Sequence, residues 1–299
     1  MPGVFYGKYS EKNNSYANAG NDNVGRFRLG HSLILPDGRV FRFVLNDGTV
    51  EVAGNLYQST VSVANHRNAT ADASRAVGAV QISATLGGTA AGIDIYAEGS
   101  VHANDATGEG NYYRINRAIE AGQAHAAADS SAVLTVNLEA HESVQVALAS
   151  STSQVSFTRN KYHQVLIHPA PPTGNVVGVS PGVAAADEFY WSQVKGYASV
   201  LADGTLLEGL HAQASITTAG AVETLKRRIR TGSTTAGDVT AFVALEDQDG
   251  AEVAAELGTI AVNTTNDITG PISINAPVVG TIVNPNATTE YALIDLNIE

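Results

Sequence analysis

The fold is decided by residues 33–54, which read LILPDGRVFRFVLNDGTVEVAG. Two turn sequences, PDG at residues 36–38 and NDG at residues 46–48, separate three runs of aliphatic, aromatic and β-branched residues. Asp-Gly and Asn-Asp-Gly supply the positive φ angles that tight hairpin turns require, and the flanking residues suit a pleated strand. The stretch therefore predicts three short strands joined by two hairpin turns.

Side-chain alternation supports this interpretation. Phe41, Phe43 and Leu45 fall on one face of the central run, while Arg42 and Val44 fall on the other. Similar runs, separated by turn signals about every 8–12 residues, continue to the end of the chain, and no long amphipathic helix interrupts them. This pattern predicts an all-β chain built of small β-barrels or sandwiches in tandem.

Composition shifts suggest where the domains divide. Residues 169–174, PAPPTG, form the clearest linker, because three prolines stiffen the chain and cannot donate to a sheet. A boundary there leaves a first β domain at residues 29–168 and a second at residues 175–299, which closes with the alternating run YALIDLNI. Residues 1–28 are rich in Gly, Asn and Ser and predict an extended N-terminal arm.

The arm carries more aromatic residues than a disordered tail would. Phe5, Tyr6, Tyr9 and Tyr16 are therefore predicted to dock on a neighbouring chain, the alternative being a floppy terminus. Trp191, the only tryptophan, lies in the densest aromatic cluster of the sequence. Because large aromatic side chains dominate protein interfaces, Trp191 is the fifth candidate contact.

Composition limits the possible partners. The 299 residues include 17 Lys and Arg against 29 Asp and Glu, a net charge of −12. Such an acidic balance argues against binding to a nucleic-acid duplex, which needs clustered cations, and the one basic run, residues 226–230, fits a solvated strand or an acidic partner. The sequence predicts neither a signal peptide nor a membrane span.

The absence of cysteine excludes disulfides and thiolate metal sites.

The apolar content is distributed over small side chains. Hydrophobic residues make up 44% of the chain, but 45 alanines account for about a third of them. Because each alanine buries little area, the core is predicted to be thin. Either a partner chain completes the burial, or several small barrels pack independently.

Several local patterns resemble reactive or metal-binding motifs without meeting their requirements. GVSPG at residues 178–182 places a proline after Ser180, where an oxyanion hole needs a backbone N–H. DQDG at residues 247–250 lacks the later ligands of a calcium loop. Asp105, Glu109 and Asn111 could gather oxygens on one loop as a weak cation site, the alternative being solvated turn residues. The pairs His125 with Glu120 and His141 with Glu142 lack a convergent third metal ligand. His163 and His168, five residues apart, fall on opposite faces of an extended strand and cannot share a metal. We therefore assign no catalytic, metal or cofactor-binding residue.

Four motifs, kept in order along nearly the whole chain, resemble a group of tailed-bacteriophage virion proteins. They are LPDGRVFRFV at 35–44 with AGNLYQ at 53–58, EGSVHANDATGEG at 98–110 with YRI at 113–115, FYWSQVKG at 189–196, and EYALIDLN at 290–297. These proteins are similar to capsid decoration, or cement, proteins. The resemblance implies a non-enzymatic subunit on the outer capsid surface of the virion, forming a homotrimer that clamps subunits of the major capsid protein. It implies no cofactor and carries over no site residues.

Two other functions stay open at this point. The chain could belong to the tail or baseplate of the same virion. It could instead be a carbohydrate-binding β-sandwich or glycosidase for host attachment, with the aromatic residues 189–191 as a sugar platform.

Overall fold

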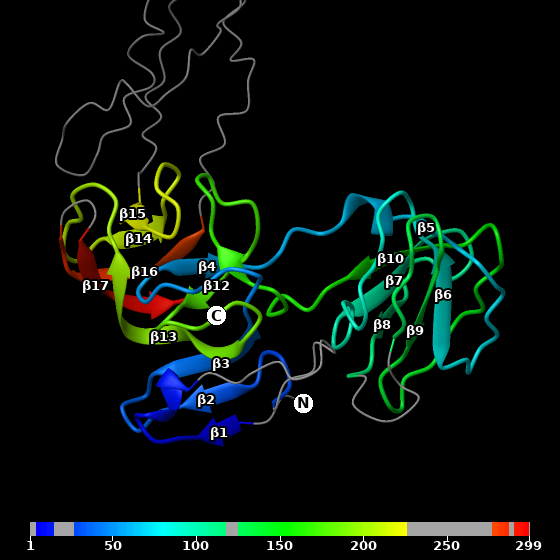
Figure 1. Cartoon of the computed structure of the whole chain (residues 1–299), viewed down its shortest axis with the longest axis horizontal. Helices are drawn as coiled ribbons and strands as arrows, with labels where there is room; N and C mark the ends of the chain where they lie inside the picture. The colour runs from blue at the N-terminus through cyan, green and yellow to red at the C-terminus, as the bar shows by residue number, and fades with distance from the viewer. Residues whose placement is uncertain (1–3, 15–26, 118–124, 226–276, 287–289, 299) are drawn as a thin grey trace, which may run out of the picture.

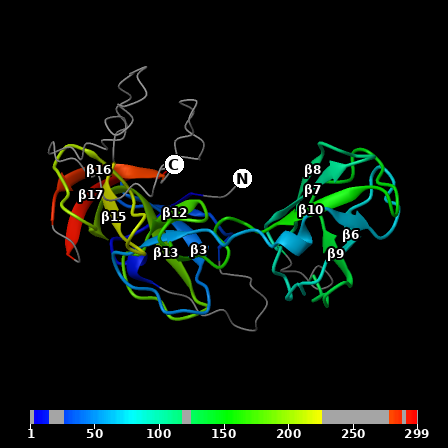
Figure 2. The same ribbon diagram turned by 90° about the horizontal axis from the view of Figure 1, so that it is seen from above.

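The computed structural model describes residues 4–14, 27–117, 125–225, 277–286 and 290–298. The regular secondary structure of these residues is almost all β-strand, and their two helical segments are single 3-10 turns, η1 (Glu11–Asn13) and η2 (Ala64–His66). The predicted all-β class is confirmed. The strands make two lobes, each with its own sheet, which lie apart along the long axis of the molecule (Figure 1) and remain separate in the orthogonal view (Figure 2).

The larger lobe, called the sheet lobe here, is an eleven-stranded sheet. Its main path runs in space through β1 (Val4–Tyr6), β2 (Ser32–Ile34), β3 (Val40–Leu45), β13 (Phe189–Leu201), β17 (Tyr291–Asn297), β16 (Val278–Asn284), β14 (His211–Ala214) and β15 (Val222–Thr224). Three short strands, β4 (Leu56–Gln58), β11 (Leu166–Ile167) and β12 (Val176–Val179), pair through β4, and β12 also joins β13.

Strand β13 holds the sheet lobe together because its two halves have different partners. Residues up to Lys195 pair antiparallel with β3, and residues from Lys195 onward pair with β17. The register shifts between Gln193 and Lys195, and a β-bulge of this kind bends a strand. The first half packs into a core cluster that contains Trp191, and the second half packs into another that contains Val200.

The run that follows β3 departs from the predicted hairpin. Residues 36–38 do turn between β2 and β3, with Gly38 at φ +85°. After β3, however, the side-chain amide of Asn46 donates to the carbonyls of Thr49 and Ala185, at 2.5 and 2.9 Å. These bonds tie the next residues to a distant loop, so the predicted third strand is absent and residues 49–53 form a loop.

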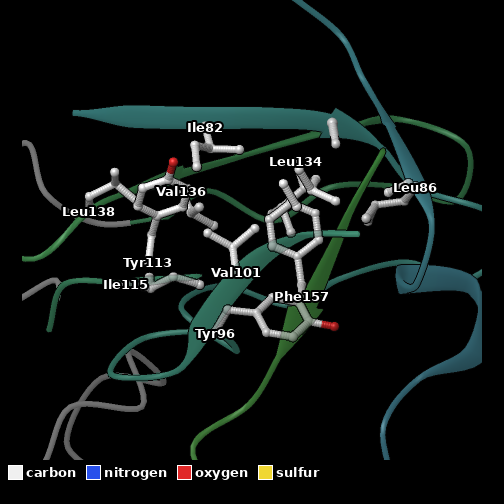
Figure 3. Close-up of a cluster of buried hydrophobic side chains, with 14 of the residues drawn as sticks. Ile82, Leu86, Tyr96, Val101, Tyr113, Ile115, Leu134, Val136, Leu138 and Phe157 are labelled. Carbon is white, nitrogen blue, oxygen red and sulfur yellow. The ribbon is translucent and has the colours of Figure 1, made fainter. Parts of the chain in front are cut away.

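The smaller lobe, called the barrel lobe here, orders its six strands as β8 (Tyr112–Arg114), β7 (Ser100–Asp105), β10 (Gln154–Thr158), β5 (Ala69–Ala71), β6 (Gln81–Thr85) and β9 (Val133–Asn137). Its outer strands meet: Asn116 N donates to Asn137 O at 3.0 Å, and Glu139 N donates to Arg114 O at 2.9 Å. The sheet thus curls until its two edges bond to each other, which protects them from strand addition. Figure 3 shows the aromatic and aliphatic side chains that fill its interior.

The predicted tandem order and domain boundaries are wrong, because the barrel lobe is inserted into the sheet lobe. β1 to β4 belong to the same sheet as β11 to β17, whereas the strands between residues 69 and 158 form the barrel lobe. Residues 169–174 do not separate two domains. They run beside β4, where the N–H groups of Thr173 and Gly174 donate to Gln58 Oε1 at 3.0 and 3.1 Å.

Candidate functional site

The candidate site is the N-terminal edge of the sheet lobe, where aromatic side chains lie outside the core. β1 pairs in parallel with β2. Within the described ranges, no strand pairs with the opposite edge of β1. An unpaired edge of this kind is a template for the addition of a strand from another chain.

Phe5 anchors this edge to the chain's own core. Its ring centroid lies 5.9 Å from that of Phe27, which in turn lies 5.3 Å from both Phe43 and Trp191. Phe5 therefore packs against the core of its own chain, which contradicts the prediction that it docks on a neighbouring chain. Within the described part of the arm, residues Val4–Tyr6 form strand β1 of the sheet lobe.

Tyr6 and Tyr9 are exposed, and their docking on a neighbouring chain stays a prediction. Their exposed fractions are 77% and 53%. Tyr6 follows Phe5 directly in β1, so strand alternation directs its ring away from the core. Tyr16 lies outside the described residues. The site is thus a short strand that is fixed on its inner face and presents tyrosine on its outer face.

Trp191 is not a surface contact, which corrects the prediction. Its side chain is 0% exposed and packs edge-on against Phe43, at a centroid separation of 5.0 Å. The strand that carries it lies in the interior of the sheet, and every residue from Phe189 to Val194 is buried. The same burial removes residues 189–191 as a sugar platform.

A cluster of charged side chains joins the two lobes and was not predicted from the sequence. Arg117 Nε lies 2.8 Å from Glu98 Oε1, and the backbone N–H of Leu29 donates to Glu98 Oε2 at 2.6 Å. Beside them, Arg28 makes a two-pronged contact with Glu139, at 2.8 and 3.0 Å. Since Arg28 and Leu29 precede β2 and the other partners belong to the barrel lobe, these contacts fix one lobe against the other.

A buried carboxyl group lies beneath the loop that follows β3. Glu51 is almost fully buried, and burial raises its pKa to about 8. The hydroxyls of Tyr57 and Tyr190 approach the carboxyl group and offset part of this effect, although neither carboxyl oxygen makes a well-aligned hydrogen bond. A group in this environment is protonated and neutral over much of the physiological range.

His163, in the segment between β10 and β11, has a buried imidazole, and we expect it to make the protein acid-sensitive. Burial, assisted by the charge of Arg159, lowers the pKa of His163 to about 3. The folded state therefore stays unprotonated while the unfolded chain binds a proton below about pH 6.5. Stability should fall by about 2 kcal/mol between pH 6.5 and pH 5 through this group. Urea unfolding of His163→Phe should lack that component, and an unchanged pH dependence would contradict the assignment.

The other candidate motifs do not form a reactive centre in the part of the chain that the structure describes. The Ser180 hydroxyl is buried and donates to Gly182 O at 2.6 Å. The ring nitrogens of His168 contact backbone carbonyl oxygens. In the barrel lobe, the buried His125 Nδ1 lies 3.5 Å from Asp94 Oδ1. No described group of three or more His, Cys, Asp or Glu side chains could hold a metal ion. Residues 247–250, residues 226–230 and Glu120 lie outside the described ranges.

Comparisons with protein-family models, with curated proteins and with solved structures each give no match to this chain. In the described ranges, no helix has the length and apolar character needed to cross a bilayer.

Proposed function

We propose that this chain is a non-enzymatic structural subunit of a tailed-bacteriophage virion. In this proposal it decorates the outer surface of the head, where it stabilises contacts between subunits of the major capsid protein. The sequence resemblance suggests the class, and the N-terminal edge of the sheet lobe supports it. The observation that carries the proposal is that no described strand pairs with the outer edge of β1, and that the exposed Tyr6 and Tyr9 lie at this edge.

The edge suits repeated attachment to a protein lattice. Phe5 fixes β1 against the core, so the backbone loses little further freedom when a partner binds. Tyrosine rings supply a large contact area at a low entropy cost and are enriched among residues that dominate binding energy. Many modest contacts of this kind, repeated over a lattice, give high overall avidity.

Charge and architecture are compatible with this placement. A net charge of −12 suits an outer surface better than direct contact with packaged DNA. The two lobes provide separate bodies that could bind neighbouring sites. We also propose that the subunit forms a homotrimer. Sedimentation analysis of the purified chain would measure this oligomeric state.

The test is occupancy on particles. Replacing Tyr6 and Tyr9 together by serine should weaken binding to heads that lack the subunit by at least about tenfold, since exposed aromatic anchors carry such energies. Tyr112→Ser is the matched control, because Tyr112 is an exposed tyrosine on the barrel lobe. Unchanged occupancy of the double variant would remove the N-terminal edge from the proposal. Electron microscopy of labelled particles would contradict head decoration if the label lay on the tail.

A further inference from the structure

A cationic patch adjoins the N-terminal edge of this acidic protein. Only five lysines occur in the whole chain, and three of them, Lys8, Lys12 and Lys195, lie here. The turn η1 brings Lys8 and Lys12 together, with Glu11 N donating to Lys8 O at 2.9 Å. The same turn contacts β13. Residues from the arm and from the centre of the sheet therefore meet on one surface.

Arg39 links the two parts of this patch. It precedes Val40, which pairs with Lys195 in the ladder between β3 and β13. Its side chain lies over Gly196, where an added Cβ atom would come within 2.9 Å of Arg39 Cγ. Arg39 also acts on Lys12. The pKa of Lys12 is lowered mainly by partial burial and further by the positive charge of Arg39. Arg39 thus neighbours both Lys195 and Lys12.

Exposed aromatic rings border these cations. Tyr9 follows Lys8 directly, and Tyr197 is 56% exposed. Lys195, Tyr197 and Ser199 alternate with the buried Ala198 and Val200, so the exposed side chains point outward from the same stretch of β13. The surface therefore combines positive charge with tyrosine.

The surrounding acids neutralise only part of this charge. Asp37 Oδ2 contacts Arg39 Nε at 2.7 Å. Glu11 lies in the turn η1, and Asp295 of β17 is the register partner of Tyr197 in β13. Three acids therefore lie beside four cations, which leaves a positive surface on a chain whose net charge is −12. An acidic partner would complement this surface.

We propose that Lys8, Lys12, Arg39 and Lys195, bordered by Tyr9 and Tyr197, form a docking surface for an acidic segment of a neighbouring lattice protein. This inference deepens the proposed function and rests on it for the identity of the neighbour. The tyrosines supply contact area, and the cations select an acidic sequence and orient it. Charge complementarity commits the surface to a polyanionic peptide rather than to an apolar one.

The experiment measures binding of a fluorescent polyglutamate peptide to the full chain by anisotropy. The Lys8→Glu and Lys12→Glu double variant should weaken binding by about tenfold or more, because charge reversal replaces attraction by repulsion. Raising the salt from 0.1 to 1 M, which shortens the Debye length from about 10 to about 3 Å, should weaken wild-type binding as well. Arg67→Glu, an exposed charge reversal away from the patch, should leave binding within about twofold.

Three outcomes would overturn the inference. The first is equal peptide binding by the wild type and the double variant. The second is tighter binding of a DNA duplex than of the peptide, abolished by the same variant. The third is self-association of the wild type that the double variant abolishes, which would assign the patch to a second copy of this chain. Failure of the peptide assay with normal decoration of particles would refute the acidic partner alone, whereas absence of the chain from particles would refute the proposed function.

Discussion

Glu51→Gln should stabilise the protein far more at pH 8 than at pH 5, by a difference of about 3 kcal/mol. Burial raises the pKa of Glu51 to about 8, from an ordinary value of 4.5. Below about pH 4.5 the carboxyl group is protonated in both the folded and the unfolded states, so it costs nothing. Between pH 4.5 and pH 8 the unfolded chain releases a proton that the folded state retains. The wild type therefore loses stability as the pH rises through this window.

Glutamine removes this titration and keeps the shape of the side chain. Urea unfolding at several pH values, followed by the fluorescence of the buried Trp191, would report on the same lobe. Comparing the two proteins across pH cancels any constant effect of the new amide group. Glu109→Gln makes the same chemical change at an exposed position of the barrel lobe and should alter neither stability nor its pH dependence by more than about 0.5 kcal/mol. Parallel pH profiles for wild type and Glu51→Gln would show that Glu51 is ionised in the folded protein.

Local patterns predicted the elements whose determinants lie close together in sequence. The turn at residues 36–38 and the terminal strand β17, with Ala292, Ile294 and Leu296 buried in alternation, both follow from their own residues. The pattern VEV at residues 50–52 misleads, because both valines are exposed and Glu51 is buried. Here the main-chain bond from Glu51 N to Ala184 O, at 2.8 Å, places the glutamate beneath the loop.

Long-range pairing could not be predicted by the same reasoning. β3 pairs with β13 across more than a hundred residues, and this pairing makes Trp191 part of the core. The insertion of the barrel lobe follows from the same pairing. The prolines of residues 169–174 correctly indicate that this segment forms no strand. That property does not identify a domain linker, because a segment that runs beside a sheet within one domain shares it. Of the candidate contacts, Tyr6 and Tyr9 could be found from composition, whereas the cluster around Glu98 depends on contacts between lobes.

The second large effect is expected at that junction, in Arg117→Met. Glu98 is buried, and its partners are Arg117 Nε at 2.8 Å and the Leu29 N–H at 2.6 Å. Removing the guanidinium leaves a carboxylate without its cation in a dry environment, which costs about 3–5 kcal/mol in other buried pairs. Arg28→Met is the matched control, because the Arg28–Glu139 pair at the same junction is 41% and 23% exposed. That pair should contribute about 1 kcal/mol or less.

Two further measurements separate lost charge compensation from lost packing. Burial raises the pKa of Glu98, while the Leu29 N–H, then Arg117, and after it Arg28 and Arg114 lower it. Without Arg117 the carboxyl should hold its proton to a higher pH, so the loss of stability should shrink as the pH falls. Adding Glu98→Gln to Arg117→Met removes the uncompensated charge but keeps an acceptor for the Leu29 N–H, and should recover about half of the loss at neutral pH. Packing alone would give a loss that neither acid nor the second substitution reduces. Equal losses for Arg117→Met and Arg28→Met would show that burial of the Glu98 pair does not decide the strength of the junction.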